Sequence, residues 1–252
     1  MHPKILLPHA RLLVEKYGAV VVAPEYRTAF EKPFPADLED CYAALLFLKV
    51  HADELGINDA QIMVGGESAG GGLTVATCLL ARDIGEVNIA FQMPLYPMLD
   101  DRETASSRDN HAPVWNTRTN RFAWKYYLRG LGGVTPPCYA APAREANYAG
   151  LPPAYAYVGT EEPFYCETLE YVANLKRAGT EASVDVYQWG YTSTRRHRGF
   201  RRRIPPLVPC LRHAAPLREE VEGSRAAFRR ALPLRHRALF RPAKNPSLSR
   251  LK

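Results

Sequence analysis

Residues 61–72 read Gln-Ile-Met-Val-Gly-Gly-Glu-Ser-Ala-Gly-Gly-Gly, and this stretch decides the fold. The apolar run at 61–64 is typical of a short buried strand, and residues 69–84 are typical of a helix that Gly85 can end. Between them, Gly66, Ser68 and Gly70 have the spacing of a nucleophile elbow, a sharp strand-to-helix turn that exposes a serine hydroxyl. The stretch therefore predicts an α/β fold with Ser68 as a nucleophile.

The chemistry of such a turn accounts for the residue types around Ser68. We expect side chains in place of Gly66 or Gly70 to collide with neighbouring elements, and Ser68 to have a positive φ. The amides that follow lie at a helix N-terminus, where developing negative charge is favoured. We therefore expect the Ala69 N–H to be one oxyanion donor and Gly70 to line the substrate site. The alternative is a phosphate cradle, but no Lys-Ser/Thr follows and the Gly-x-Gly-x-x-Gly spacing is not met from Gly65.

Strand and helix signals alternate through residues 1–190. Alternation of this kind implies a mostly parallel sheet with helices on both faces. The apolar and β-branched runs predict strands at 19–22, 61–64, 88–95, 154–158 and 183–187. Helical spacing predicts helices at 37–55, 69–84 and 167–177, the last closed by Gly179.

The composition excludes several other classes of protein. The chain has 252 residues, of which 46% are hydrophobic and 23% charged, as in a globular protein. No apolar run approaches the ~18 residues of a membrane span, and Pro8 interrupts the apolar residues at the N-terminus, so no signal peptide is expected. Five Cys without a Cys-x-x-Cys pair argue against a disulfide framework or a zinc site. These features predict a cytoplasmic protein.

The charge divides the chain into two parts. Residues 191–252 hold 15 Arg and 2 Lys against 3 Glu, a formal charge of +14, whereas residues 1–190 carry −7. The strand and helix signals also end at this boundary. We therefore expect residues 1–190 to form the folded core and residues 191–252 to form a separate basic tail.

Several short motifs resemble, in the same order, those of the hormone-sensitive-lipase-like α/β-hydrolases. They are PEYR (24–27), KPFPA (32–36), LED (38–40), GESAGG (66–71), PLYPMLD (94–100), GLPPA (150–154) and VGT (158–160). Glu67 stands where that family usually has Asp. The resemblance covers roughly residues 10–190 and implies an α/β-hydrolase fold that hydrolyses short-chain carboxylic esters. It implies a small-molecule ester as substrate, and neither a cofactor nor a metal.

The resemblance also implies further site residues. In that family the acid that orients the catalytic His follows the strand after Gly-Leu-Pro-Pro, and here Glu162 occupies that position, beside Glu161. Residues 102–130 resemble part of the family's substrate-shaping cap. Their aromatic side chains are expected either to shape the substrate site or to pack in the core; they are Trp115, Phe122, Trp124 and Tyr126.

The chain departs from the family at two motifs. The His-Gly-Gly-Gly stretch, which supplies further oxyanion amides in that family, is absent, since residues 2–9 contain no Gly. The lone His9 is expected to be a surface or helix-start residue. Thr192 stands where the family has its catalytic His, and Thr cannot act as a base at neutral pH. The nearest alternative base is His197, whose protonated form is disfavoured by Arg196 and Arg198 beside it. The chain is therefore expected to be an impaired esterase.

The tail leaves a second function class open. Its composition fits out-of-frame translation of a GC-rich gene, a disordered segment, or a basic arm for nucleic acid or anionic lipid. Its few aromatic residues make base stacking, and hence nucleic-acid binding, the weaker of these readings. The alternative to an ester hydrolase is therefore a non-catalytic α/β-hydrolase remnant, or a binding module that acts through the tail. The sequence does not indicate an oligomeric state.

Overall fold

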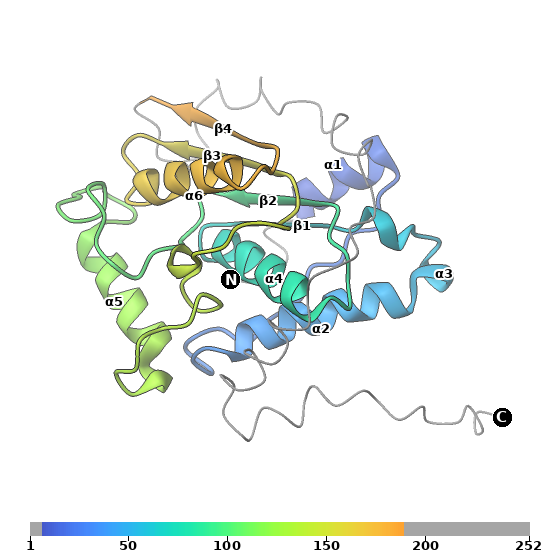
Figure 1. Ribbon diagram of the computed structural model, residues 1–252, viewed down its shortest axis with the longest axis horizontal. Helices are drawn as coiled ribbons and strands as arrows, with labels where there is room; N and C mark the ends of the chain where they lie inside the picture. Colours follow the sequence, from blue (N-terminus) through green and yellow to red (C-terminus); the bar gives the residue numbers. More distant parts are fainter. Residues whose placement is uncertain (1–6, 189–252) are drawn as a thin grey trace. The chain divides into compact units, whose positions relative to one another are not determined.

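The computed structural model describes residues 7–188 of the chain (Figure 1). Thr192, His197 and the whole basic tail at 191–252 lie outside the described residues, as do residues 1–6. The predicted division into a core at 1–190 and a tail is therefore still a prediction.

Four parallel strands form a single sheet among the described residues. The strands are β1 (Met63–Glu67), β2 (Phe91–Leu95), β3 (Ala154–Gly159) and β4 (Ala182–Tyr187), and they lie side by side in that order. Each connection from one strand to the next is long enough to contain a helix, as parallel pairing requires. The predicted strands at 61–64, 88–95, 154–158 and 183–187 are therefore confirmed, with shifts at their ends.

The register places all four carboxyl ends at one edge of the sheet. Glu67 is opposite Leu95 in the β1–β2 pair, and Gly159 is opposite Tyr187 in the β3–β4 pair. The residues that follow β1, β2 and β3 therefore emerge at the same edge, which is where ligands bind in open α/β sheets.

Helices pack on this sheet and on one another. The described helices are α1 (Leu7–Tyr17), α2 (Ala36–Val50), α3 (Ala52–Leu55), α4 (Ala69–Ile84), α5 (Thr117–Tyr127) and α6 (Tyr165–Arg177), with short 3₁₀ turns at Asp59–Gln61, Leu128–Leu131 and Pro142–Arg144. Helix α4 packs on β1 and β2, α6 packs on β3 and β4, and α2 packs on α4 (Figure 1). The predicted helix at 69–84 is confirmed with the same ends, and Gly85 caps it with φ 70°. The predicted helix at 37–55 is two helices, because the chain breaks at His51.

The predicted strand at 19–22 is wrong. These residues form no strand, and no other described segment pairs with them. Their valines, which suggested a buried strand, are Val20, Val21 and Val22, with exposed fractions of 46%, 37% and 41%. A β-branched run forms a strand only where a neighbouring strand completes its hydrogen bonds.

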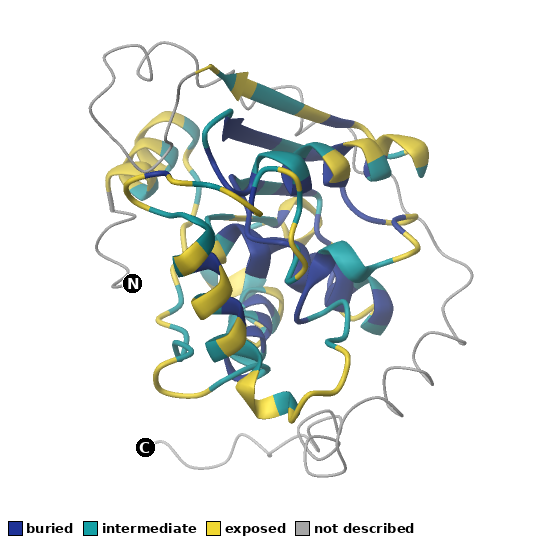
Figure 2. Cartoon of the chain, turned by 90° about the vertical axis from the view of Figure 1, so that its left-hand side faces the viewer, coloured by how far each residue is buried: buried dark blue, intermediate teal, exposed yellow. Residues whose placement is uncertain are grey.

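The core lies between α4, the sheet and α6, as the burial colours of Figure 2 show. A polar contact crosses it: the Tyr171 hydroxyl donates to the Gln92 side-chain oxygen at 2.6 Å, and the Gln92 amide donates to the Pro152 carbonyl at 2.8 Å. Buried polar groups of this kind are tolerated because their hydrogen bonds are made. Helix α6 is thereby held to β2 as well as to β3 and β4.

Candidate active site

Ser68 lies at the sharp turn between β1 and α4. Its backbone has φ 56° and ψ −118°, and α4 begins at the next residue. This conformation is uncommon for any residue other than glycine and costs on the order of 1–3 kcal/mol. The predicted strand–turn–helix setting and the positive φ of Ser68 are therefore confirmed.

Close backbone contacts require the glycines around Ser68. A Cβ at Gly66 would lie 2.4 Å from the carbonyl oxygen of Gly70, and a Cβ at Gly72 would lie 2.3 Å from the carbonyl oxygen of Met98. At Gly70 a Cβ would meet nothing within 4 Å. The expectation that Gly70 avoids a collision is therefore wrong, because an added Cβ would face open space. The other close contacts are at Gly71, where a Cβ would lie 2.9 Å from Pro97, and at Gly72.

Hydrogen bonds to the end of β2 hold the strained turn. The Ser68 N–H donates to the Leu95 carbonyl at 3.0 Å. The Ser68 carbonyl accepts from the N–H of Gly72 at 3.0 Å and from that of Met98 at 3.1 Å. The main chain of Ser68 is thus fixed on both sides by the segment that follows β2.

The amides that follow Ser68 are suited to bind an anion. Ala69 and Gly70 form the first turn of α4, and the first amides of a helix have no acceptor within that helix. They lie at the positive end of the helix dipole, and Ala69 is exposed. The arrangement can stabilise negative charge that develops next to the Ser68 hydroxyl.

Glu162 follows β3 at the same edge of the sheet. It lies in the acid loop, which we define as residues 160–164, and it is only 5% exposed. Glu161 is more exposed, and Thr160 donates a hydrogen bond to its carboxylate at 3.3 Å. The carboxylate of Asp100, another acid near this edge, is paired with Arg102. Burial and position thus agree with Glu162 as the acid, and its role is still a prediction.

Tyr96 links the two regions, and sequence reasoning missed it. It follows β2, has φ 35°, and donates a hydrogen bond from its hydroxyl to Glu67 at 2.8 Å. Burial raises the pKa of Tyr96, and the nearby charges of Glu67 and Glu162 raise it further. The charge of Glu162 thus acts on Tyr96, which is hydrogen-bonded to Glu67, the residue before Ser68. The signal in the sequence was the position of Tyr96, directly after a predicted strand.

The described residues bring one histidine near the turn. His9 lies in the first turn of α1, half exposed, with its Nδ1 3.7 Å from a carboxylate oxygen of Glu67. This agrees with the expectation of a surface residue at a helix start. His51 and His111 form local pairs elsewhere, with Glu54 and Asp109.

The aromatic residues of the cap-like segment, residues 102–130, divide between core and surface. Trp124 is 6% exposed and belongs to the core cluster that contains Tyr96 and Phe164, and Trp115 packs against that cluster. Phe122 is 60% exposed, and its ring stacks on that of Tyr126. Packing therefore accounts for Trp124, whereas Phe122 faces solvent.

Residues 7–188 contain neither a cluster of metal-binding side chains nor a helix that could cross a membrane. No three His, Cys, Asp or Glu side chains gather there as a metal site would require. No helix in that range is both long and apolar enough to cross a membrane.

Comparison with known proteins gives consistent results. A family model described as the alpha/beta hydrolase fold matches residues 7–191. Esterase LipI of Mycobacterium tuberculosis is 34% identical over 168 residues, which are 66% of this chain and 52% of that protein.

Solved structures agree with this match. A bacterial heroin esterase is 43% identical, with a TM-score of 0.62, over 65% of this chain and 53% of its own. An esterase from the bacterial hormone-sensitive lipase family is 34% identical, with a TM-score of 0.57, over 65% of this chain and 54% of its own.

This chain spans about half the length of these relatives. The family match covers most of the chain, and it includes all four parallel strands and the turn at Ser68. The chain therefore belongs to the α/β-hydrolase fold family.

Proposed function

We propose that the site around Ser68 hydrolyses carboxylic esters of small molecules. The observation that carries this proposal is the backbone of Ser68, with its φ of 56° between a parallel strand and a helix. A fold gains nothing in stability from a strained serine, and such strain is found at functional sites. The similar proteins described above, which are named as esterases, support the same reaction class.

The reaction divides into two steps. The Ser68 oxygen attacks the acyl carbonyl and expels the alcohol, and water then attacks the acyl-serine to release the acid. The oxyanion of each tetrahedral intermediate accepts hydrogen bonds from the amides of Ala69 and Gly70. Glu162 serves as the acid that orients a histidine base.

The catalytic base is one part of the machinery in which this chain departs from the family. Thr192 occupies the sequence position of the family's His, and His197 is the nearest candidate to replace it. Because a serine hydroxyl is a poor nucleophile without a base, the expected turnover is low. We therefore propose an ester hydrolase lineage whose catalytic machinery is impaired in this chain.

The test uses the full chain and a short-chain p-nitrophenyl ester. The wild type is compared with Ser68→Ala, Thr192→His and the double variant. We expect near-background turnover in the wild type, about 10²-fold or greater gain in Thr192→His, and loss of that gain in the double variant. His197→Ala serves as the matched histidine control.

Each other result has a definite meaning. A robust wild-type rate that Ser68→Ala and His197→Ala both abolish would show that His197 is the base. If neither the wild type nor Thr192→His has turnover that depends on Ser68, the chain is a non-catalytic member of the family and the proposed function is wrong.

A further inference from the structure

Two side chains of the cap-like segment hold the acid loop on either side of Glu162. The Asn110 side-chain amide donates to the Glu161 carbonyl at 3.0 Å. The Ser106 hydroxyl donates to the Pro163 carbonyl at 2.7 Å. The N–H and carbonyl of Glu162 itself are bonded to the end of β3 and the start of α6. Each peptide group around Glu162 therefore has a fixed orientation.

Ser106 and Asn110 are held in place by further bonds. The Ser106 oxygen accepts from the N–H of Cys166, in the first turn of α6, at 3.0 Å. The Asn110 amide also donates to the Ser106 carbonyl at 3.2 Å, and its oxygen accepts from the N–H of Ala112 at 2.9 Å. The two residues thus act on the acid loop as one connected unit.

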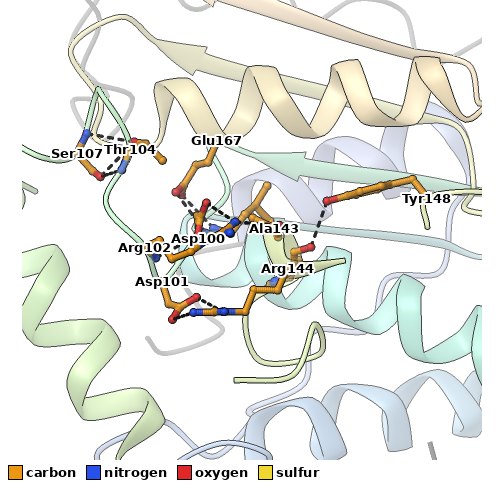
Figure 3. A network of polar contacts seen from close by, with 11 residues as sticks. Asp100, Asp101, Arg102, Thr104, Ser107, Ala143, Arg144, Tyr148 and Glu167 are labelled. Atoms are coloured by element: carbon orange, nitrogen blue, oxygen red, sulfur yellow. Dashed lines mark hydrogen bonds and ion pairs between the residues drawn. The ribbon is translucent and has the colours of Figure 1, made fainter. Parts of the chain in front are cut away.

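The residues just before the cap-like segment, 99–101, are tied to α6 and to the chain before β3 (Figure 3). Glu167 of α6 is 3% exposed, and its carboxylate accepts from the N–H of Leu99 at 3.0 Å and from that of Asp100 at 3.3 Å. Arg144 donates from its Nε to the Asp101 carboxylate at 2.6 Å. Contacts with buried partners of this kind confine a segment that would otherwise be a mobile loop.

We propose that Ser106 and Asn110 are positioning residues that fix the direction of the Glu162 carboxylate. The proposal rests on the proposed role of Glu162 as the acid. It gives the cap-like segment a task other than the substrate shaping that the resemblance implies, because the carbonyls of Glu161 and Pro163 accept hydrogen bonds from that segment. An acid that orients a base must be held within a fraction of an ångström, and the bonds to its neighbouring carbonyls supply that constraint.

The variants are Ser106→Ala and Asn110→Asp, and Ser107→Ala is the matched control. Asn110→Asp removes both donated bonds and keeps the oxygen that accepts from Ala112. Ser107 lies in the same turn, is buried, and accepts hydrogen bonds from the N–H and the hydroxyl of Thr104 instead of donating to an acid-loop carbonyl. Thr104 also contacts the Ser106 hydroxyl at 3.2 Å, so Ser107→Ala disturbs the same turn without removing a bond to the acid loop. Truncation of Ser107 therefore costs a similar hydrogen bond at a different place.

The first measurement is hydrogen exchange of the peptide that spans residues 160–168 in the full chain. We expect exchange about tenfold faster in Ser106→Ala and Asn110→Asp, the effect of one lost hydrogen bond. Ser107→Ala should leave it unchanged, and Ser106→Thr should restore protection. Unchanged exchange in the first two variants, or an equal rise in Ser107→Ala, would overturn the proposal.

The second measurement is Ser68-dependent ester turnover, which separates positioning from substrate binding. We expect a lower kcat with unchanged KM in the two variants, and Ser106→Thr should recover it. A raised KM with constant kcat would show that the segment binds substrate and does not position the acid. These rates are measured in the Thr192→His background. If Ser68-dependent turnover is absent from both the wild type and Thr192→His, the proposed function has failed, and the exchange measurement still decides whether the acid loop is held in this way.

Discussion

The turn at Ser68 shows how one residue can be strained without making the fold unstable. The strain of its positive φ is offset by three backbone hydrogen bonds, with Leu95, Gly72 and Met98. Two of these bonds go to Leu95, at the end of β2, and to Met98, just after it, so the serine cannot relax unless that segment moves too. Its hydroxyl is therefore held in one place before any substrate arrives, which is what a nucleophile requires.

Gly66 and Gly70 give a matched test of this turn. Gly66→Ala would place a methyl group 2.4 Å from the Gly70 carbonyl oxygen, whereas Gly70→Ala would meet nothing within 4 Å. We expect Gly66→Ala to lower the free energy of unfolding by about 3 kcal/mol and Gly70→Ala to leave it nearly unchanged. Urea denaturation followed by circular dichroism measures both, and equal effects would contradict the contact described here.

At the scale of elements, a buried carboxyl joins α2 to α5. Asp37 is 7% exposed, accepts from the N–H of Leu38 at 2.9 Å, and is contacted by the Tyr127 hydroxyl at 3.4 Å. Burial raises its pKa to about 6, and the charge of Asp40 adds to the rise. The ionised form of Asp37 is therefore disfavoured at the place where the cap-like segment packs on the core.

This raised pKa predicts a dependence of stability on pH. Because the folded state holds the Asp37 proton more tightly than the unfolded state, protonation favours folding as the pH falls through about 6. Relative to Asp37→Asn, the wild type should gain about 2 kcal/mol in free energy of unfolding between pH 7 and pH 4.5. Denaturation midpoints of the wild type and Asp37→Asn at the two pH values measure this. A difference between wild type and Asp37→Asn that is constant with pH would contradict it.

The two faces of α5 differ in their contribution to stability. Trp124 is 6% exposed and Phe122 is 60% exposed, although the two residues are only two positions apart in the sequence. We expect Trp124→Ala to cost about 3–5 kcal/mol, the usual effect of a buried aromatic truncation, and Phe122→Ala to cost less than about 1 kcal/mol. Thermal unfolding of both variants checks this. A large loss from Phe122→Ala would contradict the exposed placement of its ring.

For the whole molecule, the sequence predicted the elements whose local signals and tertiary contacts agree. The helix at 69–84 had helical composition and a glycine stop, and both are present. The strand at 19–22 failed because strand propensity does not reveal whether a partner strand is present. Helix α1 was missed because its sequence lacks an acidic first turn and begins close to Pro8.

The candidate site was predictable to the extent that it depends on sequence position. Ser68 was found by the spacing of its motif, and Glu162, whose role is still a prediction, was proposed from the resemblance to the hormone-sensitive-lipase-like family. Tyr96 could have been noticed by its position directly after a predicted strand. Ser106 and Asn110 act through contacts between segments far apart in the sequence, so no local pattern could indicate them.

The absence of a histidine at position 192 predicts an unusual pH profile for the full chain. Without a base, attack by Ser68 depends on hydroxide, so the rate should rise steadily with pH. In Thr192→His the rate should instead level off above the ordinary histidine pKa of about 6.5. Initial rates from pH 5 to pH 9 distinguish these cases, and a chelator should change neither. A plateau in the wild type that His197→Ala removes would contradict this expectation.

The all-parallel sheet has a consequence for how this protein folds. None of the four described strands pairs with its neighbour through a tight turn, so each of these pairings must close a long loop before it is stabilised. Topologies dominated by such distant pairings fold slowly. The serine turn needs the segment after β2, and the acid loop needs β3 together with residues 106–110. In a refolding experiment, reactivity of Ser68 should therefore appear with the last structural phase, well after helical signal has returned.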